Sequence, residues 1–182
     1  LYIQAAEAGD GFSMKSLGKV FASGELGVQD NERSSKYYEQ AFETLYDMAI
    51  GENDADAQCD LGNSYLDGEG VQQNYTLAVK MFQRAMANAL PRAYNALGIC
   101  YESGYGVAKD CNKGFELKLK SAELGVPIAM KNVAMSYLNG DPVEKNEQKY
   151  IEWIRKSADC GHPGAQSSIG TDYLYGKFSD KD

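Results

Sequence analysis

The chain has 182 residues, of which 43% are hydrophobic and 24% are charged, a balance typical of a folded protein rather than a disordered one. Its formal net charge of −8 repels phosphate backbones and anionic membrane surfaces, so we expect no nucleic-acid partner. No run approaches the roughly 20 apolar residues of a membrane-spanning helix, so we expect no membrane insertion. The chain starts at Leu1 rather than Met, which suggests a segment or processed form of a longer protein.

Helical spacing of apolar residues divides the chain into successive helix pairs. In PRAYNALGICYESG, Ala93, Leu97 and Tyr101 recur every four residues, which predicts one buried face of a first helix. First helices of this kind are expected to begin near residues 11, 55, 91, 127 and 163. In chain order the expected units are 1–9 (the end of a preceding second helix), 10–53, 54–89, 90–125, 126–161 and 162–182 (a partial unit). The sequence therefore predicts a single all-α repeat domain over residues 1–182.

A seven-residue phrase ends each first helix and returns every 36 residues. It reads YLDGEGV from Tyr65, YESGYGV from Tyr101 and YLNGDPV from Tyr137. The phrase lacks the lysine and hydroxyl of a phosphate-binding loop, so we interpret it as a turn between two helices. Gly104 suits the left-handed residue that follows a helix end, and Gly98 is expected where a second helix approaches closely.

The second helix of each pair is expected to begin after a short polar capping residue. Asn74, Asp110 and Asn146 hold this position, and each can accept a hydrogen bond from the first turn. The step from Asp30 to Asn74 is 44 residues, eight more than the usual 36, and the extra residues must lie between Asp30 and Asn53. An apolar stripe at helical spacing continues through this segment, so we predict a lengthened second helix rather than a long loop.

The pattern A..LG..Y..G.GV..D, followed by a second helix that ends in KAA..G, resembles the SEL-one-like repeat, a relative of the tetratricopeptide repeat. AYNALGICYESGYGVAKD and YIEWIRKSADCG match it closely, while Val133-Ala134 and Asp141-Pro142 depart from it. The resemblance implies a right-handed α-solenoid of stacked antiparallel helix pairs, about five repeats long, whose first helices line a concave face. It also implies an exported, for example periplasmic, location more readily than a cytoplasmic one.

Residues with catalytic or metal-binding chemistry are sparse. His162 is the single histidine, which excludes histidine-based triads and two-histidine metal sites, and the four cysteines lack zinc-ligand spacing. Asp54 and Asp56 flank a helix start, where carboxylates favour the positive end of the helix dipole. Asn74 begins a glycosylation acceptor pattern but is already explained as a cap, and Trp153 occupies a core position. We therefore expect no cofactor, no metal and no enzymatic activity.

The positions of the first helices that are not needed for internal packing predict a partner-binding surface on the concave face. They combine apolar and polar side chains, as binding grooves do. The predicted set is Asn63, Leu66, Asp67, Arg92, Asn95, Ile99, Glu102, Lys131, Met135, Leu138, Thr171 and Tyr175, with Leu174 beside the last of these. The alternative is that some of these side chains cover the seams between repeats.

These observations favour a non-enzymatic scaffold that holds a protein or peptide partner in its concave groove. The resemblance implies this role broadly, since family members act as adaptors, and it adds two narrower alternatives. One is a bacterial immunity protein that covers the active site of a toxin, and the other is a weak β-lactamase-like hydrolase. The hydrolase is disfavoured because no serine lies beside a lysine or histidine in a recognisable motif. Self-association through the open ends of the helix array is a further possibility.

Overall fold

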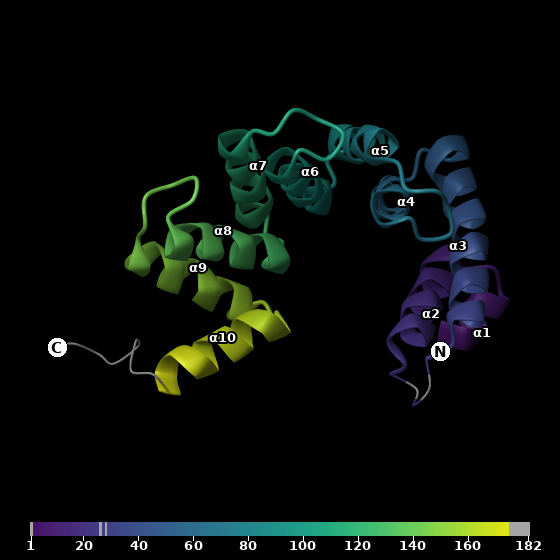
Figure 1. Ribbon diagram of the computed structural model, residues 1–182, viewed down its shortest axis with the longest axis horizontal. Helices are drawn as coiled ribbons and strands as arrows, with labels where there is room; N and C mark the ends of the chain where they lie inside the picture. The colour runs from purple at the N-terminus through teal and green to yellow at the C-terminus, as the bar shows by residue number, and fades with distance from the viewer. Residues whose placement is uncertain (1, 26, 28, 175–182) are drawn as a thin grey trace. The chain divides into compact units, whose positions relative to one another are not determined.

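The computed structural model describes residues 2–25, 27 and 29–174, and these fold into helices joined by short turns (Figure 1). The helices are α1 (Tyr2–Glu7), α2 (Gly11–Ser23), α3 (Asn31–Gly51), α4 (Ala55–Asp67), α5 (Tyr75–Ala87), α6 (Pro91–Ser103), α7 (Cys111–Glu123), α8 (Pro127–Asn139), α9 (Glu147–Asp159) and α10 (Pro163–Leu174). The five first helices begin at or beside the predicted residues. The predicted fold class, an α-solenoid of stacked antiparallel helix pairs, is confirmed.

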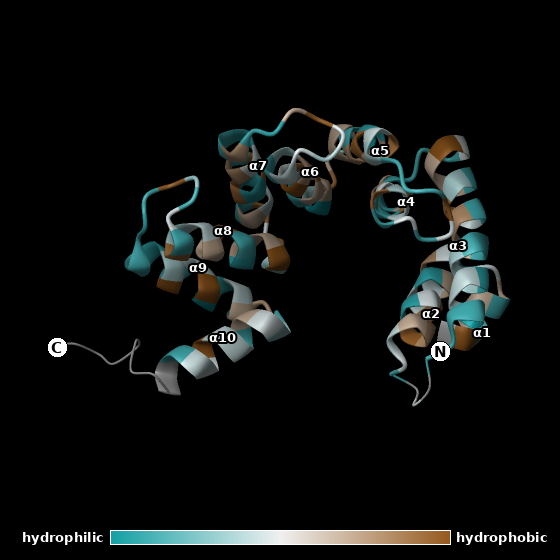
Figure 2. Cartoon of the chain, in the orientation of Figure 1, coloured by the Kyte–Doolittle hydropathy of each residue, from teal (hydrophilic) through white to brown (hydrophobic). Residues whose placement is uncertain are grey.

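The chain forms two compact units, which we describe separately. The first contains α1–α5 and residues 105–107, and the second contains α6–α10 without those three residues. In the first unit α2 packs on α3, α3 on α4 and α4 on α5. In the second unit α6 packs on α7, α7 on α8, α8 on α9 and α9 on α10. Hydrophobic and hydrophilic positions lie on different sides of single helices, as on α3 and α9 (Figure 2). The single continuous domain over 1–182 stays a prediction.

The predicted capping residues begin the second helices. The side chains of Asp30, Asn74, Asp110 and Asn146 each accept a hydrogen bond from the backbone N–H three residues later, at 2.9–3.0 Å. This contact satisfies one of the N–H groups that the first turn of a helix leaves without a partner. Asp54 does the same for α4, and Asp56 lies in the first turn of that helix, as expected.

Close packing within a helix pair depends on the glycine of the Leu-Gly motif. A Cβ atom on Gly98 would lie 2.8 Å from the Gly114 carbonyl oxygen and 2.9 Å from Cγ of Lys118. Gly62 faces the ring of Phe82 at a similar distance, and Gly18 faces Tyr38. The predicted close approach of the second helix is therefore confirmed.

The two glycines of the turn have different roles. The first ends α4, α6 or α8 in the left-handed conformation, with φ near 75° at Gly68, Gly104 and Gly140. The second touches the preceding second helix: a Cβ on Gly70 would lie 2.1 Å from the Tyr38 carbonyl oxygen, and one on Gly106 would lie 2.3 Å from that of Tyr75.

The turn after α8 departs from this arrangement, as its sequence does. Pro142 stands where the other turns have their second glycine, and the Asp141–Pro142 peptide bond is cis. The turn still ends in the same way, because the backbone N–H of Asn146 donates to the Tyr137 carbonyl oxygen at 2.9 Å, as Asp110 does to Tyr101.

The predicted lengthening of the second helix is confirmed, since α3 has 21 residues whereas α5, α7 and α9 have 13 each. The extra turns change where the next repeat attaches. The glycine turn meets α5 at its first residue, Tyr75, but meets α3 at its eighth, Tyr38. Seven residues of helix correspond to about 10 Å. In the first unit, α4 and α5 are therefore displaced by that length along α3, compared with a repeat that attaches at the first residue of the preceding second helix.

The backbone contact of the second glycine predicts a large difference between two alanine variants. Gly106→Ala meets both an unfavourable φ of 68° and the Tyr75 carbonyl, whereas Gly125→Ala has a φ of 92° but no atom within 4 Å of the new Cβ. We expect Gly125→Ala to cost about 1–2 kcal/mol from backbone strain. Gly106→Ala should cost about 1–3 kcal/mol more because of overpacking. Urea unfolding of both variants measures this, and equal losses would contradict the contact.

Candidate binding surfaces

Three predicted residues come together in a hollow of the second unit. Ile99 and Glu102 of α6 and Met135 of α8 line a cavity of about 250 Å³. The remaining lining residues come from α7, α8 and the turn that follows α8: Lys118, Asn132, Ser136, Asn139 and Asp141. The structure thus gathers apolar and hydrogen-bonding groups from the predicted set in one place.

An ion pair between a buried lysine and a partly exposed glutamate forms one side of this hollow. Lys118 lies on α7 and is only 3% exposed, and its Nζ lies 2.9 Å from Oε1 of Glu102. The stem of Lys118 passes beside Gly98, where any side chain would block it. Sequence reasoning missed Lys118, although a signal existed: it stands eight residues after the cap, where α3 and α5 have Tyr38 and Phe82.

Asn95 was predicted to face a partner but is 7% exposed. Its Oδ1 accepts a hydrogen bond from Nδ2 of Asn132 at 2.9 Å, which links α6 to α8. Asn95 therefore fixes Asn132 at the hollow, and Asn132 is the more accessible of the two.

The other predicted residues of the second unit lie outside the hollow. Leu138 packs partly against the core cluster of α8, α9 and α10, as the seam alternative expects, and Met135 also touches that cluster. Arg92 and Lys131 are half-buried, and Thr171 is exposed with its hydroxyl donating to the Ser167 carbonyl. Tyr175 and the side chain of Leu174 lie outside the described part of the chain.

The predicted residues of the first unit lie on α4. Leu66 is half-buried, and Asn63 donates to Oδ1 of Asp60 at 3.4 Å. Burial, followed by the negative charge of Glu69, raises the pKa of the Asp67 carboxyl.

A buried lysine connects α2 to α4 in the first unit. Nζ of Lys15 donates to the Asp60 carbonyl at 2.8 Å and to Oγ of Ser64 at 2.9 Å, and it lies 3.4 Å from Oε2 of Glu69. The Lys15 side chain is only 6% exposed. Burial lowers the pKa of Lys15, and the charge of Glu69 opposes this effect. Sequence reasoning missed the cluster because 49 residues separate Lys15 from Ser64.

The approach of Lys15 to Ser64 brings a serine beside a lysine, which the sequence did not reveal. A nucleophilic serine must be accessible and must transfer its proton to a base. Ser64 is buried and its hydroxyl donates to the Asp60 carbonyl at 3.1 Å, while Lys15 is engaged by three oxygen groups. The arrangement stabilises the contact between repeats and presents no accessible nucleophile.

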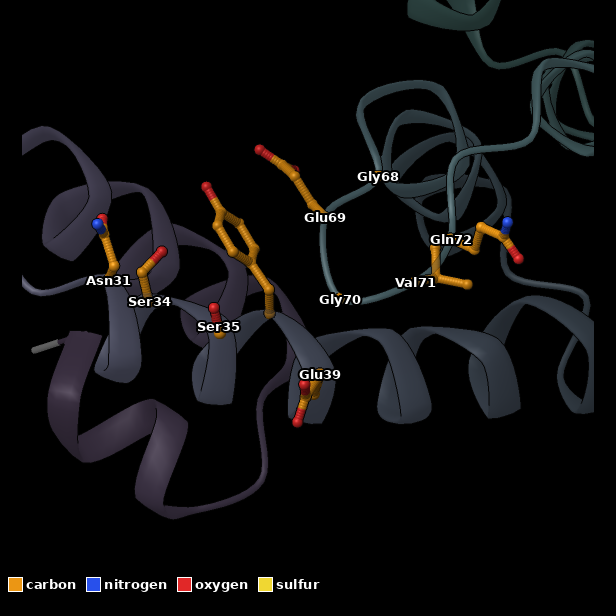
Figure 3. Close-up of a pocket in the computed structure, with 10 residues that line it drawn as sticks. Asn31, Ser34, Ser35, Glu39, Gly68, Glu69, Gly70, Val71 and Gln72 are labelled. Carbon is orange, nitrogen blue, oxygen red and sulfur yellow. The ribbon is translucent and has the colours of Figure 1, made fainter.

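A polar hollow of about 560 Å³ lies between the start of α3 and the turn after α4. Figure 3 shows Asn31, Ser34, Ser35 and Glu39 along α3, with Glu69 and Gly70 of the turn beside them. Burial, followed by the negative charge of Glu69, raises the pKa of Tyr38, another lining residue. This hollow depends on the two extra turns of α3 and was not predicted.

Several residues with possible catalytic or metal-binding chemistry are buried or engaged in hydrogen bonds. Nδ1 of His162 accepts a hydrogen bond from the Ala165 N–H at 3.2 Å, at the start of α10. Cys59 and Cys100 are buried, and burial raises the pKa of the Cys100 thiol to about 11. Trp153 is half-buried against two core clusters. Among the described residues, no three potential metal ligands gather at one point, and every helix is too short or too polar to span a bilayer.

Comparison with known proteins identifies the family. The Sel1 repeat matches residues 55–88, 91–126 and 127–162, which is more than half of the chain. The chain belongs to the Sel1 repeat family. No curated protein matches it.

Solved structures with this fold are similar over almost the whole chain. A Sel1 repeat protein from Oxalobacter formigenes is 27% identical with a TM-score of 0.68, and the match covers 98% of this chain and 68% of that one. The protective antigen c5321 of uropathogenic Escherichia coli, which displays an SLR fold, is 28% identical with a TM-score of 0.60. That match covers 96% of this chain and 36% of the antigen. Sel1 repeat proteins generally mediate protein–protein interactions.

The buried contact between Lys15 and Glu69 predicts a strong coupling between the two side chains. Lys15→Met leaves the largely buried Glu69 carboxylate without its cation and should lower the free energy of unfolding by about 3 kcal/mol. Adding Glu69→Gln removes that uncompensated charge, so the double variant should recover most of the loss. A double-mutant cycle by urea unfolding measures the coupling. Additive effects of the two substitutions would show that the pair contributes no coupling.

Proposed function

We propose that the chain is a non-enzymatic scaffold that binds a protein or peptide partner through the first-helix surface of its second unit. The observation that carries the proposal is the hollow lined by Ile99, Glu102 and Met135. These residues belong to the set that the repeat pattern alone marked as free for a partner.

The size of the hollow favours a protein partner over a small molecule. Pockets for small molecules usually have volumes of about 300–1,000 Å³ and enclose most of the ligand. The hollow has a volume of about 250 Å³, which suits one inserted side chain of a larger partner. Ile99 and Met135 supply apolar contact, and the amide of Asn132 supplies hydrogen bonds that fix the register.

The Lys118–Glu102 pair adds charge selectivity to this surface. Lys118 is buried and its ammonium engages one oxygen of Glu102, so the pair is held in place before a partner arrives. A preorganised polar group loses little conformational entropy on binding. The family-wide role in protein–protein interaction supports the same reading.

The test compares two double variants of the second unit as affinity baits in lysate of the source organism. Ile99→Ala with Met135→Ala removes apolar contact from the hollow. The control, Leu124→Ala with Ile128→Ala, removes two exposed apolar side chains that do not line it. Circular dichroism checks that both variants fold.

We expect a partner captured by the wild type and by the control to be lost from the hollow variant. Calorimetry with that partner should then show at least about tenfold weaker binding, or about 1.4 kcal/mol. Equal affinity of the hollow variant and the wild type would contradict the proposal. Light scattering of the purified chain separately tests self-association.

A further inference from the structure

The second half of α3 carries an exposed face that is both aromatic and acidic. It contains a shallow hollow of about 410 Å³, which is lined by Phe42, Glu43, Tyr46 and Asp47. Tyr46 is 44% exposed, and Ile50, one helical turn further on, is 42% exposed. Large hydrophobic side chains with this exposure are uncommon among the described residues, and here two of them follow one another on the same helix.

The rings of this face are held in place by the core. Phe42 packs against the buried cluster of α3 and α4, which includes Leu45 and Leu61. Its ring meets Tyr65 edge-on, with centroids 5.4 Å apart and planes at 87°, and lies 6.2 Å from the ring of Tyr46. The aromatic surface is therefore preorganised and does not need to be assembled on binding.

The rings at the ends of α2, α6 and α8 are each covered by a cation of the same chain. Arg33 lies over Phe21 at 5.6 Å, Lys113 over Tyr101 at 4.2 Å and Lys149 over Tyr137 at 4.9 Å. Each cation stands three residues after the helix cap, where the second repeat has Leu77. Among the described residues no lysine or arginine covers Phe42, Tyr46 or Tyr65, and none forms an ion pair with Glu43 or Asp47.

We propose that this face docks an arginine side chain of a partner protein, with an aliphatic side chain of the same partner on Ile50. A guanidinium stacks on an aromatic ring while its N–H groups donate to neighbouring carboxylates, here Glu43 and Asp47. The net charge of −8 draws a basic partner to the surface. Lysine fits less well, because its ammonium cannot stack or form a planar fork of donors.

The spacing of the face suggests how the partner segment is arranged. Tyr46 and Ile50 are four residues apart on one helix, which is about 6 Å. Side chains on one face of an extended segment are two residues apart, or about 7 Å. An extended segment with arginine and an aliphatic residue separated by one position therefore matches both contacts.

This surface lies in the first unit and does not depend on the hollow proposed for the second. The probe is the peptide acetyl-Arg-Gly-Leu-amide, titrated into the isotopically labelled chain and followed by NMR. Its control is the same peptide with citrulline, which keeps the shape and loses the charge. The test variant is Glu43→Gln with Asp47→Asn. The control variant is Glu116→Gln with Glu123→Gln, which changes the net charge by the same amount on exposed residues of α7. A ¹H–¹⁵N spectrum checks the fold of each variant.

We expect the arginine peptide to shift the ring resonances of Tyr46 and the methyl resonances of Ile50. Binding should weaken at least tenfold in the Glu43→Gln, Asp47→Asn variant and with the citrulline peptide, and should not change in the α7 variant. The proposal would be overturned by equal binding of both peptides, by equal effects of both variants, or by the absence of any shift at about 10 mM peptide. Shifts of Tyr46 that depend on protein concentration without peptide would also overturn it, because a second copy of the chain would then occupy the face.

Discussion

The contact between the second glycine of a turn and the backbone of the preceding second helix sets the register of the repeats. At Gly70 and Gly106 the backbones come so close that a Cβ would overlap a carbonyl oxygen. At these two turns a larger residue would have to displace the backbone, so the neighbouring helices have little freedom to slide. Side-chain contacts between helices, such as Asn95 with Asn132 and Lys15 with Ser64, then form at positions that this register brings together.

The extra turns of α3 follow from the same constraint. Because the next repeat attaches at Tyr38 rather than at the first residue of the helix, the start of α3 extends before this contact. The polar hollow at Asn31–Glu39 and the aromatic face at Phe42–Asp47 lie along this one helix.

The elements of the fold could be predicted from the sequence because the residues that begin and end each helix lie within the same repeat. Caps such as Asn74, the left-handed Gly104 and the length of α3 depend on neighbours close in the chain. The side chains of the sites were harder to predict, because they depend on contacts between repeats. Asn95 was expected to face a partner, but it is buried and hydrogen-bonded to Asn132. Lys118 can reach Glu102 because Gly98 has no side chain in its path. Ile99 and Met135 line the hollow, and their role in binding stays a prediction.

We propose that the first-helix surface of the second unit holds a protein partner. Hydroxyl-radical footprinting of the chain alone and in complex with its captured partner tests this binding surface, because oxidation of a side chain reports its access to solvent. We expect Met135 and Ile99 to become protected in the complex while Leu124 and Ile128 keep their reactivity. Protection of Leu124 and Ile128, with Met135 and Ile99 unchanged, would contradict it.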